Sequence, residues 1–220
     1  MTVNYAKSES TRVVSIYGPP AFGKSQVAIA AGHDLKSQGK KVYHIDLYDV
    51  HTKDDFISAL LRFCSNQSVG HYSRVVDFLL QEFRKIEEPK YFILDNADHL
   101  LKPEVKDGLI LLMKDILANC SKLTFTVSTR ESFEFSVLES LGQKEVRIES
   151  LDNVSSQNLV QKWLSEVSNA DCEKIAQFCG HVPILIRVMC NAFPQNELPL
   201  SQAIENLLGP PTVFYLGWIT

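Results

Sequence analysis

The sequence predicts an α/β fold, in which a parallel sheet flanked by helices is followed by a small all-helical segment. Over the first 150 residues, short apolar runs alternate with helical patterns, which is typical of parallel strands joined by helices. From Asn153 onward only helical patterns follow. We therefore expect a sheet domain over residues 1–150, a helical segment over 151–208 and a tail over 209–220 that we assign to no element.

The expected strands are short and rich in apolar or β-branched side chains. They cover residues 13–17, 42–47, 91–94, 123–128 and 145–148. The helices between them are expected over residues 25–37, 54–64, 73–85, 103–119 and 135–141. Pro103 is suited to the first turn of its helix, and Gly39 ends the first helix. In the helical segment we expect helices over 155–167, 171–179, 183–193 and 200–208.

Composition narrows the class of protein. The 220 residues are 45% hydrophobic and 22% charged, as in average soluble proteins, and the net charge is −4. Because Lys and Arg are scattered, we expect no nucleic acid as a partner. The five cysteines form no CxxC pair, which indicates reduced thiols in a cytoplasmic protein. The apolar stretch Val213–Ile219 is far shorter than the ~20 residues that span a bilayer, so we expect no membrane association.

A phosphate-binding loop follows the first expected strand. The segment GPPAFGKS matches the pattern G-x-x-x-x-G-K-[ST]. Glycines let consecutive backbone N–H groups point at phosphate oxygens, the lysine reaches the outer phosphates, and the serine hydroxyl binds Mg²⁺. The start of the next helix adds partial positive charge. The sequence thus predicts a P-loop NTPase sheet, with a nucleotide bound by Gly18, Pro19, Pro20, Ala21, Phe22, Gly23, Lys24, Ser25 and Gln26.

An acidic residue at the end of a neighbouring strand is expected to complete the magnesium site. Asp95 closes the apolar run 91–94 and fits that role, so Ser25 and Asp95 are the expected Mg²⁺ ligands. Asn96 follows, where ATPases of this kind often carry an acidic base. With Asp95 and Asn96 as the catalytic candidates, we expect slow or absent hydrolysis, because an amide accepts no proton. Asp98 is a possible substitute base, although capping of the following segment is the simpler interpretation.

Two further segments carry a family resemblance. Arg130 closes FTVSTR at the end of another strand, and CGHVPIL lies between two expected helices. The order GPPAFGKS, YFILDNAD, FTVSTRE and CGHVPIL resembles the NB-ARC group of signal-transduction ATPases with numerous domains (STAND), over residues 12 to about 208. By itself, Pro183 would be a proline that begins a helix.

The resemblance implies specific roles. ADP or ATP with Mg²⁺ would be the cofactor, Arg130 would sense the terminal phosphate, Gly180 would permit the helix junction, and Pro183 would pack on adenine. The helical segment would be a lid, and the chain would be a regulatory switch that signals to protein partners or self-associates. Family members usually continue beyond this lid, so the chain resembles the first part of a larger architecture.

Other functions on the same sheet remain open. An AAA-type ATPase or loader would share these motifs, as would a nucleotide-bound interaction module without turnover. A small-molecule kinase would need a basic lid, whereas residues 155–208 hold only Lys162, Lys174 and Arg187. A GTPase would need an Asn-Lys-x-Asp segment to read guanine, and the sequence contains none.

Overall fold

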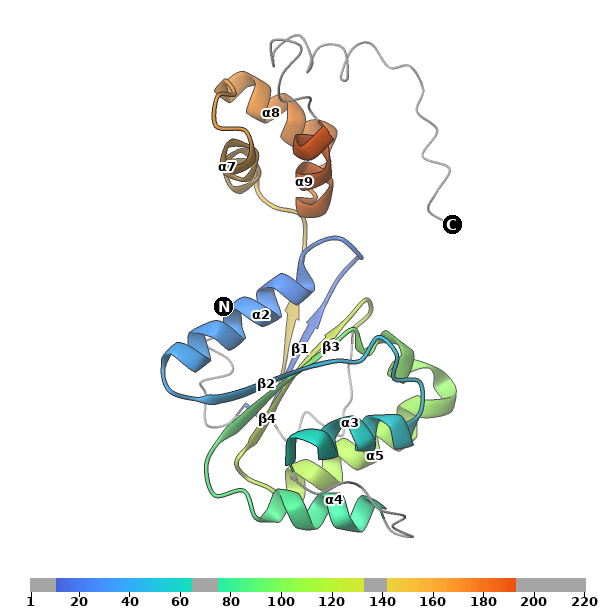
Figure 1. Ribbon diagram of the computed structural model, residues 1–220. Coiled ribbons are helices and arrows are strands. Elements are labelled where there is room, and N and C mark those ends of the chain that lie inside the picture. The colour runs from blue at the N-terminus through green and yellow to red at the C-terminus, as the bar shows by residue number, and fades with distance from the viewer. Residues whose placement is uncertain (1–10, 65–74, 133–141, 193–220) are drawn as a thin grey trace. The chain divides into compact units, whose positions relative to one another are not determined.

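The computed structural model describes residues 11–64, 75–132 and 142–192 (Figure 1). The chain forms two compact units, which are described separately. The first contains the sheet and comprises the residues up to Pro20 together with Lys24–Ile148, and the second comprises Ala21–Gly23 and the residues from Glu149 onward. The helices expected over 135–141 and 200–208, and the tail over 209–220, lie outside the described residues.

The sheet has five parallel strands in the order β2-β3-β4-β1-β5. Their bounds are β1 Val13–Tyr17, β2 Lys41–Asp46, β3 Lys90–Asp95, β4 Leu123–Thr129 and β5 Gln143–Arg147. This confirms the predicted parallel α/β sheet. The last strand begins two residues earlier than expected, because Gly142 turns the chain at a φ of 75° and Gln143 already pairs with Val13. All five strands end at the same edge of the sheet.

Helices cover both faces of the sheet (Figure 1). Helix α2 (Lys24–Ser37) lies on one face, and α3 (Lys53–Cys64), α4 (Val75–Arg84) and α5 (Pro103–Asn119) lie on the other. Side chains of β3 alternate between the two cores, as the period of a strand requires: Phe92 and Leu94 pack with α3–α5, while Ile93 packs with α2. The α2 side is tight, because a Cβ atom on Gly32 would lie 2.5 Å from Ile93 Cδ1.

A short 3₁₀ helix, η1 (Ala97–Leu101), follows β3 and was absent from the sequence prediction. The chain enters it through Asn96, which has left-handed dihedral angles of φ 57° and ψ 41°. Ala97 and Leu100 are buried in the core beside α3 and α5. Five residues are too few to display a helical period, so the pattern carries no signal for this element.

The second unit contains three described helices: α7 (Asn153–Trp163), α8 (Asn169–Phe178) and α9 (Pro183–Ala192). The helix expected to reach Val167 ends at Trp163, because Leu164 is extended and Ser168 already caps α8 by accepting a hydrogen bond from the Asp171 N–H. The core of the unit includes three buried thiols, Cys172, Cys179 and Cys190. Burial raises the pKa of the Cys179 and Cys190 thiols to about 11.

Several large apolar side chains of the second unit are exposed. Val154 and Trp163 lie on α7, and the others lie at the end of α8 and on α9: Phe178, Ile184, Leu185 and Val188. No single helix in the described ranges is long and apolar enough to cross a membrane. Helices α8 and α9 reach that length and composition only as a pair, which is bent by 119° at its junction.

Candidate nucleotide-binding site

The expected phosphate loop connects β1 to α2. Its backbone adopts positive φ at three positions, Gly18 at 151°, Ala21 at 72° and Gly23 at 93°, so the chain curls sharply over eight residues. Pro19, Pro20 and Ala21 are exposed, and Phe22 and Gly23 are half-buried. Gln26 is an exposed residue in the first turn of α2. The loop therefore presents its backbone to a ligand at the carboxyl end of the sheet, where α/β proteins bind ligands.

Gly18 is fixed by its neighbour as well as by its backbone. The N–H group of Ile148 donates to the carbonyl of Tyr17 at 2.7 Å. A Cβ atom on Gly18 would lie 2.3 Å from the Ile148 carbonyl oxygen. The first glycine of the loop is therefore needed for close approach to the end of β5.

Lys24 is the first residue of α2, and its side chain turns back over the loop. Its Nζ donates to the carbonyl oxygens of Gly18 at 2.8 Å and Pro19 at 2.9 Å. Burial lowers the pKa of the Lys24 ammonium, nearby Asp98 opposes this shift, and Arg130 adds to it. The ammonium group thus lies inside the loop, where it would meet phosphate oxygens.

Ser25 and Asp95 meet at the strand ends. Ser25 Oγ donates to Asp95 Oδ1 at 3.0 Å, and the hydroxyl of Ser128 donates to the same oxygen. Asp95 is buried, with 4% of its surface exposed. Carboxylate and hydroxyl oxygens are the ligands that Mg²⁺ prefers, with the rest supplied by phosphate and water. The oxygen set of Ser25 and Asp95 therefore fits a magnesium–nucleotide complex.

The side chain of Asn96 is occupied by a hydrogen bond to Asp46. Its Nδ2 donates to Asp46 Oδ1 at 2.9 Å, at the end of the neighbouring strand β2. This hydrogen bond lowers the pKa of Asp46 below its ordinary value. His44, also from β2, has its Nε2 at 3.7 Å from Asp95 Oδ2. Asp46, His44 and Ser128 were not predicted as site residues, although Asp46 and Ser128 lie at strand ends, as Asp95 does.

Arg130 directly follows β4 and is paired with Asp98. The backbone N–H of Arg130 donates to Asp98 Oδ1 at 2.6 Å, and its Nε lies 3.6 Å from Asp98 Oδ2. Asp98 therefore does not cap the following segment, as the sequence suggested, but binds the end of a strand. Its side chain contacts the expected phosphate sensor of the site.

Gly180 and Pro183 belong to the helical unit and are described with it. Gly180 and His181 both have positive φ, 58° and 59°, and this pair ends α8. The carbonyl of His181 accepts from the Leu151 N–H at 3.0 Å, and its Nδ1 lies 2.8 Å from Ser156 Oγ. Pro183 is half-buried and begins α9. The junction is thus a defined turn, in which the His181 imidazole is oriented by its contact with Ser156.

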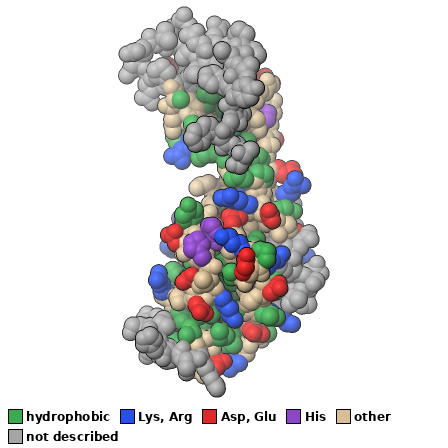
Figure 2. Space-filling view, turned by 90° about the vertical axis from the view of Figure 1, so that its right-hand side faces the viewer, with side chains coloured by type: hydrophobic (Ala, Val, Ile, Leu, Met, Phe, Trp, Pro, Cys, Tyr) green, Lys and Arg blue, Asp and Glu red, His purple; other side chains and the backbone are tan. Residues whose placement is uncertain are grey.

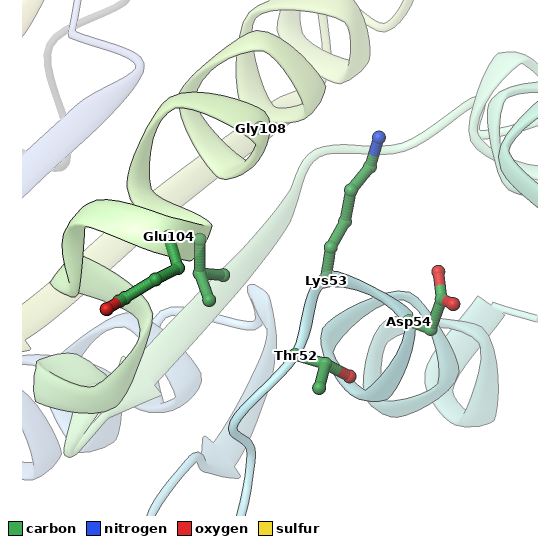
Figure 3. A pocket seen from close by; sticks show the side chains of 6 residues that line it. Thr52, Lys53, Asp54, Glu104 and Gly108 are labelled. Atoms are coloured by element: carbon green, nitrogen blue, oxygen red, sulfur yellow. The ribbon is translucent and has the colours of Figure 1, made fainter.

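A separate depression of about 340 Å³ lies between the starts of α3 and α5 (Figure 3). Its lining residues are Thr52, Lys53, Asp54, Glu104, Val105 and Gly108. None of them comes from the phosphate loop or from the strand ends around Asp95. On the face shown in Figure 2, acidic and basic side chains of the sheet unit are interspersed.

Comparison with solved structures supports the fold. A STAND protein with a tetratricopeptide repeat sensor from Pyrococcus horikoshii is similar over 96% of this chain and 32% of its own, at 14% identity and a TM-score of 0.60. A Walker-type ATPase of Pyrococcus abyssi is similar over 93% of this chain and 69% of its own, at 14% identity and a TM-score of 0.62. The Aeropyrum pernix Orc1 protein in complex with DNA is similar over 93% of this chain and 62% of its own, at 14% identity and a TM-score of 0.65.

At these identities the likeness shows the fold, and the chain spans about a third of the length of the STAND protein. No curated protein matches the chain in sequence. A family profile described as "AAA domain" (AAA_22) matches residues 7–136, which include the phosphate loop, Asp95 and Arg130. Because this match covers more than half of the sequence, the chain belongs to the AAA domain family of P-loop proteins.

Proposed function

We propose that this chain is a regulatory switch of the NB-ARC type that binds ADP or ATP with Mg²⁺ and hydrolyses ATP slowly or not at all. The observation that carries the proposal is the 3.0 Å contact between Ser25 Oγ and Asp95 Oδ1, where Asp95 also interacts electrostatically with the Lys24 ammonium. It unites a magnesium-binding oxygen pair with a phosphate-binding cation at one end of the sheet. The STAND protein among the similar structures agrees with a signalling role.

Slow hydrolysis is supported by the two residues that could have served as the base, Asn96 and Asp98. Asn96 offers an amide where a carboxylate would remove a proton, and that amide is engaged by Asp46. The alternative acid, Asp98, is engaged by Arg130. Since general base catalysis contributes roughly 10²–10⁴-fold to the rate, its loss leaves bound ATP unhydrolysed for longer. A long-lived bound state is what a switch requires.

The helical unit, from about residue 151, is proposed to be a lid that closes over adenine through Gly180 and Pro183. Its exposed apolar side chains on α8 and α9 favour docking onto another surface. Hydrogen exchange with and without ADP tests this role. Protection of residues 175–190 together with the Gly18–Ser25 loop is expected. Protection of the loop alone would remove the lid from the proposal.

The switch is proposed to act in the cytoplasm on protein partners or through self-association. The decisive experiment identifies the nucleotide that purified protein releases on denaturation, followed by competition among ATP, ADP, GTP and GDP. We expect an adenine nucleotide and a clear preference for ATP and ADP. A preference for GDP would exclude this function.

A second candidate is an AAA-type ATPase or loader, which the family profile favours directly. The similar Orc1 protein was solved in complex with DNA, so the proposal that this chain binds no nucleic acid needs its own test. The interspersed charges in Figure 2 support that proposal. Titration with single- and double-stranded DNA, combined with turnover and assembly measurements, separates the two functions. DNA-stimulated turnover with ring assembly favours the loader, and the absence of both turnover and a nucleotide response favours a pure interaction module.

A further inference from the structure

The side chains of Asp46 and Asn96 form a pair across two neighbouring strand ends. In the register of β2 and β3, Asp46 lies opposite Asp95, the residue before Asn96. Asn96 Nδ2 donates to Asp46 Oδ1 at 2.9 Å, and the same oxygen accepts from the Tyr48 N–H at 3.0 Å. A carboxylate accepts only, so the amide nitrogen of Asn96 must face it.

The backbone of Asn96 is held as firmly as its side chain. Its N–H donates to Asp95 Oδ1 and to Ser128 Oγ, both at 3.1 Å. Its left-handed dihedral angles are the conformation that asparagine tolerates better than most residues. The backbone bonds and the hydrogen bond to Asp46 together orient the side chain at position 96.

The carboxylate of this pair, Asp46, lies at the end of β2. The amide, Asn96, follows Asp95, the expected Mg²⁺ ligand, and so occupies the position where a catalytic base would be useful. During ATP hydrolysis the water oxygen bonds to the terminal phosphorus, the bond to the ADP oxygen breaks, and the water proton needs an acceptor. Asn96 cannot be that acceptor, so the proton passes to a phosphate oxygen or to solvent. A carboxylate at position 96 would take it directly.

We propose that Asp46 is a positioning residue: it orients the side chain at position 96, and the pairing of positions 46 and 96 decides whether a carboxylate placed at position 96 can act as the base for ATP hydrolysis. The inference rests on the proposed nucleotide function. It makes a specific claim about substitutions. Asn96→Asp alone places two carboxylates against each other, and their repulsion displaces the new base. Asn96→Asp with Asp46→Asn exchanges the two groups and keeps the hydrogen bond, now with an amide on β2 that holds a carboxylate beside the magnesium site.

The test compares wild type, Asp46→Asn, Asn96→Asp and the exchange variant by single-turnover hydrolysis of radiolabelled ATP. ATP affinity and thermal unfolding are measured on each protein. We expect the exchange variant to hydrolyse at least about tenfold faster than wild type and than either single variant, with ATP affinity changed by less than about threefold. Asp49→Asn removes the same charge from an exposed position in the loop that follows β2 and is expected to change neither quantity.

If Asp46 only stabilised the fold, its substitution would change ATP affinity and the unfolding temperature, but the exchange variant would hydrolyse ATP no faster than Asn96→Asp. An exchange variant that binds ATP as wild type does, but turns over no faster than Asn96→Asp, overturns the inference and leaves the proposed function intact. Failure of wild type to bind ATP overturns both. If the exchange variant does not fold, Asp46→Ser with Asn96→Asp supplies a hydroxyl donor in place of the amide, and the same comparison of rates decides.

Discussion

Asp98 holds Arg130 at the carboxyl end of the sheet, with a backbone hydrogen bond of 2.6 Å and a 3.6 Å contact to the guanidinium group. The ion pair is largely solvated, since 65% of the Arg130 side chain is exposed. A terminal phosphate that binds Arg130 would compete with this carboxylate. We therefore expect Asp98 to influence how readily Arg130 reaches a bound ATP.

Replacing Asp98 with Asn should increase the preference for ATP over ADP. Asparagine keeps an oxygen that accepts the Arg130 N–H but removes the charge that holds the guanidinium. Because exposed ion pairs contribute up to about 1 kcal/mol, the ratio of the two affinities should shift by about two- to fivefold. Competition titrations of ATP and ADP measure the ratio. Glu131→Gln, an exposed charge next in sequence, is the control, and an equal shift there would contradict a specific role for Asp98.

Lys24→Ala should weaken ADP and ATP binding by roughly 10–100-fold, because hydrogen bonds to charged groups are worth about 1.5–3 kcal/mol. The fold should persist, since among the described residues the ammonium bonds only to loop carbonyls of Gly18 and Pro19. Titration with a fluorescent ADP analogue gives the affinity, and circular dichroism checks the fold. Lys36→Ala, an exposed lysine on the same helix, should bind as wild type does. Unchanged binding in a folded Lys24 variant would end the phosphate role.

Asp95→Asn should remove the contribution of Mg²⁺ to nucleotide affinity. The buried carboxylate is the anionic member of the Ser25–Asp95 pair, and an amide binds a hard cation poorly. We expect ADP affinity to be nearly the same in Mg²⁺ and in EDTA for this variant, and clearly different for wild type. Asp107→Asn, an exposed aspartate on α5, should behave as wild type. A variant that still responds fully to Mg²⁺ would place the cation elsewhere.

Two helical glycines should respond in opposite ways to alanine. On α5, a Cβ atom at Gly108 would find nothing closer than Lys53 Cδ at 3.8 Å, so Gly108→Ala should stabilise the fold by about 0.5–1 kcal/mol. On α2, Gly32→Ala must displace Ile93 Cδ1 from 2.5 Å and repack a tight interface. Urea unfolding should therefore rank Gly108→Ala above wild type and Gly32→Ala below it. The reverse order would contradict the packing of α2 on β3.

The buried thiols of the helical unit should make stability fall at alkaline pH. Burial raises the pKa of Cys179 and Cys190 from 9.0 to about 11 in the folded state. Between these values the unfolded chain loses protons that the folded chain retains, so the free energy of unfolding decreases as pH rises. For the two thiols together, the decrease should be on the order of 2 kcal/mol between pH 9 and pH 10. Denaturant titrations across this range measure it.

The matched control for the thiols is Cys179→Ala with Cys190→Ala. Its alkaline loss should be smaller than that of wild type by the contribution of these two groups. An identical pH slope in both proteins would show that other groups are responsible.

Sequence patterns predicted the sheet, because apolar runs and helical periods alternate clearly up to β5. They predicted Lys24, Ser25 and Asp95 as site residues, because phosphate and magnesium chemistry requires those residue types after particular strands. The Asp46–Asn96 pair could not be foreseen, since it depends on β2 lying next to β3 in the sheet. A hydroxyl such as Ser128 at the end of a strand is also too common to be singled out. The positions of these partners are properties of strand order rather than of any local pattern.

The contact between Gly18 and Ile148 links the phosphate loop to the end of the sheet unit. Ile148 is the last residue of the sheet unit, and its N–H and carbonyl both lie against the residues that open the loop. A change of the backbone angles at Gly18 would act on Ile148 through this close approach and through the hydrogen bond between the Ile148 N–H and the Tyr17 carbonyl. A rearranged loop would thus act directly on the residue that precedes the connection to the helical unit, through a backbone hydrogen bond and close packing and without any charged group.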